Sequence, residues 1–280
     1  MPASSKPTAP RFGWRPMLRI AGSLALLTAL AATVDLGQAV RLLAGADPVA
    51  VAGLLAVAHL QVLLSGLRWR GVARRLGLPL GRAAACGEYY LCLLLNQLLP
   101  GGVSGDAIRA WRHARRLPAL SDGGGTGRAL RAVVLERFAG QVAFFALAGL
   151  GLALWPFVMP GGYAPWIAGA ATGLGAAILG VLAGLALGAR IGPRRWRDGV
   201  AALVPEGRKA LLANGAWRTQ LPLNLAVAGC LIAAFALAAE AVGPALPAGA
   251  WFTVVPLTLL ALVLPISVGG WGLRESAAAL

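Results

Sequence analysis

Long apolar runs alternate along this chain with short polar or basic segments. Five of the runs are long enough, at about 18 residues or more, to cross a bilayer as single helices. They comprise residues 17–34, 48–67, 129–155, 166–189 and 221–242. The pattern predicts an all-α polytopic integral membrane protein.

The first apolar run allows two interpretations. Residues 17–34 follow a polar stretch at 1–16 that is rich in Pro and Ser, and we expect this stretch to be a disordered cytoplasmic tail. The run could also be a signal peptide, with cleavage near Ala31. Its length exceeds that of most signal-peptide cores, which favours an uncleaved membrane span.

Two further apolar runs, 83–100 and 251–265, are short and each ends in a proline that is soon followed by glycines. Backbone without helical hydrogen bonds is tolerated at membrane depth only where protein or a water-filled cavity covers it. The segments on both sides of 83–100 are strongly basic, so both are expected in the cytoplasm and the run must turn back. We predict a re-entrant hairpin here, and a second one at 251–272 that enters from outside.

The two broken segments share a motif. Five residues recur 165 positions later: Leu99, Pro100, Val103, Gly105 and Arg109 match Leu264, Pro265, Val268, Gly270 and Arg274. Identities at one fixed offset indicate an internal repeat. We predict a single transmembrane domain over 17–280, with repeats at about 17–155 and 164–280. The first repeat crosses the membrane three times, and because this number is odd the second repeat has the opposite orientation. Two repeats of opposite orientation are typical of secondary transporters. The symmetry also predicts that 273–280 begins a last span.

The connecting segments are predicted in less detail. We expect an external loop at 35–47, a flexible loop at 121–127 and a basic loop at 190–218. Arg68-Trp69-Arg70 has the composition of an interfacial anchor. The segment 106–117 is amphipathic and is typical of an interfacial helix.

Composition agrees with a membrane protein, because 58% of the residues are hydrophobic and 12% are charged. A soluble domain carries about twice that charged fraction. The net charge is +15. Most of the basic residues flank the apolar runs, which is the positive-inside pattern and places the N-terminus in the cytoplasm. This distribution argues against nucleic-acid binding, which needs a basic folded surface.

The first broken segment carries a candidate anion site. Gly101, Gly102 and Gly105 leave backbone N–H groups uncovered just before a helix that we expect to begin near Asp106. Arg109, one turn later, could bind a lipid phosphate in a bidentate manner. The glycines could equally form only a turn, Asp106 could be an N-cap or could contact a cationic headgroup, and Arg109 could be an interfacial arginine.

Two adjacent charges, Glu136 and Arg137, fall inside a predicted span. Charged residues in a membrane are costly and are usually functional or paired. Neighbours on a helix point about 100° apart, so each is expected to pair with another segment, with Asp106 and Arg274 as candidate partners. Asn96 could line the same cavity together with Glu88. By the repeat, Gly269, Gly270, Arg274 and Glu275 complete the candidate lipid headgroup site.

The sequence offers little for other chemistry. The three cysteines lie in apolar segments and are expected to be small core residues. We find no metal-ligand spacing, no nucleophile beside a base and no cofactor motif. We therefore expect no metal, no cofactor and no catalytic residue.

The motifs resemble those of one family. Asn96 to Arg109, which reads N-x-x-L-P-G-G-x-x-G-D-x-x-R, is followed by Glu136-Arg137 and by L-P-x-S-x-G-G-x-G-x-R-E at Leu264 to Glu275. Together they resemble the lysylphosphatidylglycerol synthase transmembrane, or flippase-like, family. The resemblance implies a multi-pass protein of the bacterial inner membrane. In its best-understood members this domain moves an aminoacylated phospholipid between leaflets. We expect a stand-alone member without the family's cytoplasmic aminoacyl-transferase domain, so the resemblance does not imply lipid synthesis.

Three functions are compatible with these observations. The first is a translocator for an anionic phospholipid or glycolipid, with membrane lipids as its partners. The second is a membrane enzyme that acts on lipid headgroups and uses Glu88, Asp106, Glu136 or Glu275 as its base. The third is a non-catalytic partner of a lipid-modifying envelope enzyme. The sequence leaves the lipid, the energy source and the oligomeric state open.

Overall fold

The computed structural model describes residues 28, 36–98, 103–117, 124–158, 165–243, 248–252 and 255–256. These ranges form helices joined by short connections, with no strand among them. The helices are α2 Leu36–Ala44, α3 Pro48–Arg75, α4 Arg82–Leu98, α5 Ser104–Arg115, α6 Gly124–Val158, α7 Pro165–Ile191, α8 Arg194–Gly207, α9 Trp217–Val242 and α10 Ala248–Phe252.

Three helices of the described part are long and apolar enough to cross a membrane: Pro48–Arg75, Gly125–Phe157 and Trp217–Val242. They correspond to three of the predicted spans, and the all-α prediction is confirmed. The span predicted at 166–189 forms the 27-residue helix α7. The run 17–34 and most of the second hairpin lie outside the described residues. The inverted repeat and the re-entrant insertion stay predictions.

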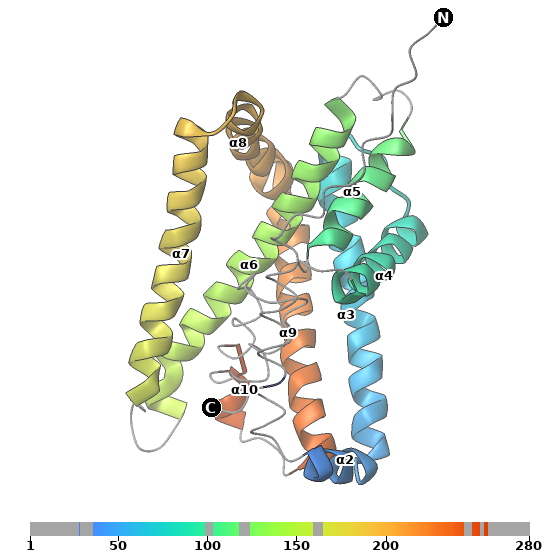
Figure 1. Ribbon diagram of the computed structural model, residues 1–280, viewed down its shortest axis with the longest axis vertical. Coiled ribbons are helices and arrows are strands. Elements are labelled where there is room, and N and C mark those ends of the chain that lie inside the picture. The colour runs from blue at the N-terminus through green and yellow to red at the C-terminus, as the bar shows by residue number, and fades with distance from the viewer. Residues whose placement is uncertain are drawn as a thin grey trace, which may run out of the picture.

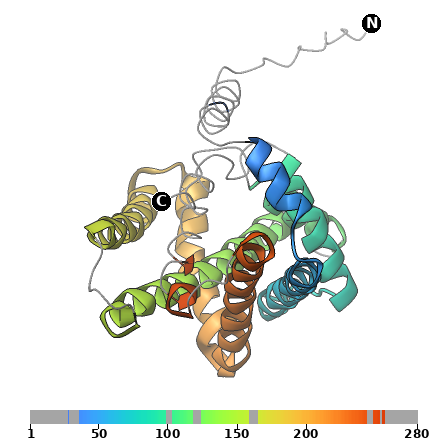
Figure 2. The same cartoon turned by 90° about the horizontal axis from the view of Figure 1, so that it is seen from below.

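The long helices form a bundle in which α3 and α9 pack side by side along their length (Figure 1). Figure 2 shows α6 crossing between α7 and the group formed by α3, α4 and α5. Helices α4 and α5 pack against each other, and α5 in turn packs on α6. The segment predicted as the first hairpin forms the helix α4, which packs on α3, and the segment predicted as an interfacial helix forms α5, which lies between α4 and α6.

The basic segments gather at one end of this bundle. The C-terminal ends of α3 and α7, the N-terminal ends of α6 and α9, and all of α8 lie toward the same end in Figure 1. Helices α2 and α10 lie at the opposite end. The predicted alternation of the spans is consistent with this arrangement.

Several connections differ from expectation because they form helices of their own. Helix α2 occupies most of the predicted external loop 35–47. The predicted basic loop 190–218 contains α8, a π-helical turn at Arg208–Leu212 and a 3₁₀ turn at Ala213–Gly215. Helix α6 begins at Gly124, inside the predicted flexible loop. The loops at 35–47 and 190–218 were predicted from their charged residues and the loop at 121–127 from its glycines, and neither feature excludes a helix whose other residues favour it.

Local signals set the limits of α3. The carboxylate of Asp47 accepts hydrogen bonds from the backbone N–H groups of Val49 and Ala50, both at 3.1 Å, and Pro48 occupies the first helical position. The helix ends where Gly77 adopts a φ of +79°, which favours glycine. This extent carries Arg68 and Trp69 into the helix interior rather than to its end.

The close contact between α4 and α5 depends on a glycine. A Cβ atom at Gly105 would overlap the carbonyl oxygen of Cys92 in α4. Another glycine, Gly87 of α4, has open space where a Cβ would lie.

We expect Gly105→Ala to destabilise the protein by about 3 kcal/mol, because backbone must move to relieve the overlap. Gly87→Ala is the matched control and should stabilise by up to about 1 kcal/mol, because alanine favours helix. Thermal unfolding midpoints of the two variants in detergent measure the difference. Equal midpoints would show that the α4–α5 contact is not as close as described.

Candidate functional site

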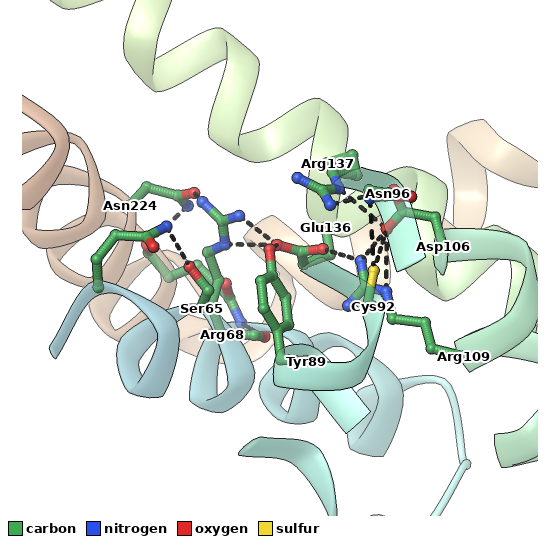
Figure 3. A network of polar contacts seen from close by, with 12 residues as sticks. Ser65, Arg68, Tyr89, Cys92, Asn96, Asp106, Arg109, Glu136, Arg137 and Asn224 are labelled. Carbon is green, nitrogen blue, oxygen red and sulfur yellow. Dashed lines mark hydrogen bonds and ion pairs between the residues drawn. The ribbon is translucent and has the colours of Figure 1, made fainter. Parts of the chain in front are cut away.

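Glu136 of α6 is a fully buried carboxylate with bonding partners on three other helices. Its Oε1 accepts a hydrogen bond at 2.9 Å from Arg68 Nε of α3, and Arg68 Nη2 forms a second, shorter contact with it. Its Oε2 accepts a bond at 2.7 Å from Arg109 Nη2 of α5. Tyr89 of α4 donates its hydroxyl to Oε1 at 3.4 Å. Glu136 therefore ties α3, α4, α5 and α6 together (Figure 3).

Asp106 is the second carboxylate of the network and pairs with two arginines. Arg109 donates to its Oδ1 from Nε at 3.0 Å and from Nη2 at 2.8 Å. Arg137 donates from Nε to Oδ1 at 3.1 Å, and its Nη2 lies 3.1 Å from Oδ2. The predicted pairing of Arg137 with Asp106 is present, whereas Glu136 pairs with arginines that were not foreseen as its partners.

The start of α5 corrects two expectations. The helix begins at Ser104 with Val103 as its N-cap, so Asp106 lies in the first turn and is not the cap. The backbone N–H of Gly105 donates to Asn96 Oδ1 at 2.7 Å, so this amide is already satisfied without a phosphate. Asn96 also donates to Asp106 Oδ2 at 3.3 Å. Asn96 thus fixes α4 to α5 instead of lining a cavity.

Arg109 lies in the protein interior and does not reach the interface. Only 1% of the residue is exposed, and its guanidinium packs on the rings of Trp69 and Tyr89 at 4.8 and 4.7 Å from their centroids. Trp69 is fully buried and Arg68 is 4% exposed, so the predicted anchor Arg68-Trp69-Arg70 is wrong for its first two residues. The aromatic rings and the carboxylates stabilise these buried positive charges and offset the cost of removing them from water.

Glu88 belongs to a separate ion cluster at the basic end. It pairs with Arg112 at 2.8 Å and with Arg116 on the same helical face. Burial opposes ionisation of Glu88, but the bonds and charges of Arg112 and Arg116 outweigh burial and lower its pKa. This carboxylate therefore holds α4 to α5 and does not face the central network.

The described part of the central network carries more positive than negative charge. The linked guanidiniums are those of Arg68, Arg109 and Arg137, and the linked carboxylates are those of Asp106 and Glu136. One positive charge is left over. Arg137 is the most accessible of the three arginines, with 40% of its side chain exposed.

A cavity of about 240 Å³ opens beside this surplus charge, between α3, α4, α6 and α9. Arg68 and Arg137 line it together with three amide side chains, those of Gln61, Gln141 and Asn224. Asn224 Oδ1 accepts a bond from Arg68 Nη1 at 2.9 Å, which connects α9 to the network. The remaining lining includes apolar side chains, among them Phe144, Val227 and Leu231.

The lysylphosphatidylglycerol synthase TM region family model matches residues 17–280. The chain belongs to this family. No curated protein and no solved structure matches it. Membership indicates a membrane protein with a lipid-related role, and the resemblance seen in the sequence motifs is confirmed.

The structure brings together about half of the residues that the family motifs pointed to. Asn96, Gly105, Asp106, Arg109, Glu136 and Arg137 all belong to the central network or contact it directly. The other six candidates, Gly101, Gly102, Gly269, Gly270, Arg274 and Glu275, lie outside the described residues.

Sequence reasoning missed Arg68, Tyr89, Asn224 and Gly140. Gly140 lies one turn after Glu136, and a Cβ there would lie 2.6 Å from Arg68 Nη1, so the glycine makes room for the guanidinium. Gly140 is four residues after Glu136, and residues at this spacing share a helix face. The sequence could therefore have indicated that Gly140 lies beside the partner of Glu136. Arg68 was interpreted as an interfacial anchor because it lies next to other basic residues at the end of an apolar run.

Glu136→Gln removes the charge that compensates Arg68 and Arg109. We expect a loss of about 3–5 kcal/mol of stability, the usual cost of breaking a buried ion pair from one side. The matched control is Glu206→Gln, because Glu206 binds Arg131 at 2.7 Å while about a fifth of its side chain is exposed. That change should cost about 1 kcal/mol or less. Thermal unfolding in detergent compares them, and equal losses would contradict the central role of Glu136.

His113 of α5 gives a pH dependence to stability. Burial lowers its pKa from 6.5 and Arg116 lowers it further, outweighing the hydrogen bond to Pro79 O and the charge of Glu88. A depressed histidine pKa means that the unfolded state binds the proton more readily, so stability is full above pH 6.5 and falls as the pH drops below it. The slope is about 1.4 kcal/mol per pH unit down to the folded pKa.

His113→Phe should flatten this part of the profile while keeping the edge-on ring contact with Trp69, whose centroid lies 5.4 Å from that of His113. Unfolding midpoints between pH 7.5 and 5.0 test the prediction. An unchanged slope in the variant would assign the pH dependence to another group.

Proposed function

We propose that this protein moves an anionic phospholipid or glycolipid between the leaflets of the bacterial inner membrane. The proposal rests on the cavity beside Arg137 and Arg68, next to a network that carries one more positive than negative charge among the described residues. An unbalanced charge at membrane depth is costly, and an anionic ligand offsets that cost. A lipid phosphate is the most abundant anion that a bilayer offers.

The cavity lining fits an amphiphilic ligand. A guanidinium from Arg137 can bind a phosphate in bidentate geometry. The amides of Gln61, Gln141 and Asn224 offer donors and acceptors to headgroup hydroxyl or amino groups. Phe144, Val227 and Leu231 present apolar surface to the glycerol and acyl part of the lipid.

The helix arrangement supports movement of the ligand. The basic end of the bundle would lie in the cytoplasm by the positive-inside rule. Helix α4 would enter the membrane from that side as part of a re-entrant hairpin, and α5, which packs on it, would follow as the amphipathic helix. The second repeat would supply the inverted counterpart. Alternating access would then come from rocking of one repeat against the other.

Two alternatives remain open to test. An enzyme acting on headgroups needs a free general base, but Glu88, Asp106 and Glu136 are all bound by guanidiniums. Incubation with membrane lipids would reveal an enzyme by a product of changed mass. Affinity capture from detergent extracts would reveal a partner enzyme.

Arg137→Gln provides a sharp test because it removes the surplus charge and leaves two arginines balanced by two carboxylates. The protein should still fold, and transfer of labelled phosphatidylglycerol in proteoliposomes should fall about tenfold or more, as expected for loss of a charge-assisted phosphate contact. Arg190→Gln is the matched control, since Arg190 is an exposed residue at the end of α7. It should leave the rate unchanged.

Arg137→Lys refines the same experiment. Lysine keeps the charge but cannot bind a phosphate in bidentate geometry, so an intermediate rate is expected. A folded Arg137→Gln protein that moves lipid as fast as the parent would refute the assignment of the site.

A further inference from the structure

A second, larger cavity lies at the basic end of the bundle. Its volume is about 620 Å³, and it is bounded by the C-terminal part of α3, the start of α4 and the start of α9. Four of its lining residues are arginines: Arg70, Arg74, Arg75 and Arg82. None of the described residues that line it is acidic. We call this cavity the basic cleft.

The arginines of the basic cleft are not neutralised by the described protein. Arg70 Nε donates to the carbonyl oxygen of Leu80 at 3.0 Å, and Arg75 Nη1 donates to that of Ala213 at 3.3 Å. These bonds orient two guanidiniums without compensating their charge. Arg74 and Arg82 are exposed and form no hydrogen bond or ion pair with any described residue. The cleft therefore concentrates positive charge that is free to meet an anion.

A buried polar atom gives an independent indication of a ligand. Gln220 lines the cleft, is 3% exposed, and its Oε1 has no hydrogen-bond partner in the described part of the chain. A buried amide oxygen without a donor is costly. A headgroup hydroxyl or ammonium would supply that donor, whereas a bare phosphate dianion would not.

The apolar part of the lining favours a lipid. Leu67 and Leu223 form part of the wall, and Leu221 and Leu225 are exposed on the adjoining surface of α9. An acyl chain can lie along such leucines while its phosphate meets the arginines. This combination is the one expected where a transmembrane helix reaches the headgroup layer.

We infer that the basic cleft is a second binding site for an anionic phospholipid, distinct from the central cavity. It would hold the phosphate between the guanidiniums and a headgroup hydroxyl or amino group at Gln220. The two sites are neighbours, because Gln220 Nε2 lies 3.5 Å from the carbonyl oxygen of Arg68, and Asn224 Nδ2 donates to the carbonyl oxygen of Gln220 at 2.8 Å. The inference concerns binding and does not require that the lipid be moved.

Native mass spectrometry in a neutral detergent tests this site. The starting protein carries Arg137→Gln, so that the central cavity has lost its surplus charge. Phosphatidylglycerol should still bind, and adding Arg74→Gln with Arg82→Gln should weaken binding about thirtyfold, the loss expected from two guanidiniums near a lipid phosphate. Adding Arg194→Gln with Arg197→Gln is the matched control, because these two arginines are exposed on α8 outside the cleft. It should leave binding unchanged.

Two further ligands identify the chemistry. Phosphatidylcholine, which has no net charge, should bind weakly to all variants, and inorganic phosphate at millimolar concentration should not displace phosphatidylglycerol. Displacement by phosphate would make the cleft a site for soluble anions and would overturn the lipid assignment. Equal phosphatidylglycerol binding with and without the Arg74 and Arg82 changes would overturn the site itself. Neither result tests transport through the central cavity. That proposal is tested separately by the rate at which the Arg137→Gln variant transfers lipid in proteoliposomes.

Discussion

The ion pairs of Glu136 hold the described part of this protein together. A carboxylate with no exposed surface is unfavourable in an apolar bundle unless cations and hydrogen-bond donors surround it. Arg68 and Arg109 meet that requirement from two other helices, and Tyr89 adds a hydroxyl from a third. Because the partners come from different segments, the carboxylate fixes how α3, α4, α5 and α6 lie relative to one another. Pairing of this kind specifies an arrangement even where its net contribution to stability is small.

The same pairing sets up the cavity. Arg68 is held by Glu136 on one side and by Asn224 on the other, and Gly140 leaves the space through which its guanidinium passes. Asp106 holds Arg137 at the rim, where part of its side chain remains accessible. A structural network and a ligand site therefore share residues. The arginines that are buried deepest maintain the fold, and the accessible one is available to a ligand.

The sequence was sufficient for some of these features and not for others. Apolar runs predicted α3, α6 and α9, and the rule that intramembrane charges are paired indicated that Glu136 and Arg137 bind other segments. The identity of Arg68 as a partner could not be inferred, since basic residues at the end of an apolar run usually anchor at the interface. Gly105 was taken as part of an anion-binding turn, whereas its missing Cβ lets α5 approach α4 and its N–H is bound by Asn96. Periodicity reports which face of a helix is apolar, but partners that are distant in sequence depend on tertiary packing.

An experimental structure determined with phosphatidylglycerol present would test the central claim most directly. Headgroup phosphate is expected in the cavity between α3, α4, α6 and α9, within about 3 Å of the Arg137 guanidinium. The contacts of Glu136 with Arg68 and Arg109 are expected to persist when the lipid is bound. A cavity that holds only water or an acyl chain, with Arg137 turned away from it, would contradict the account.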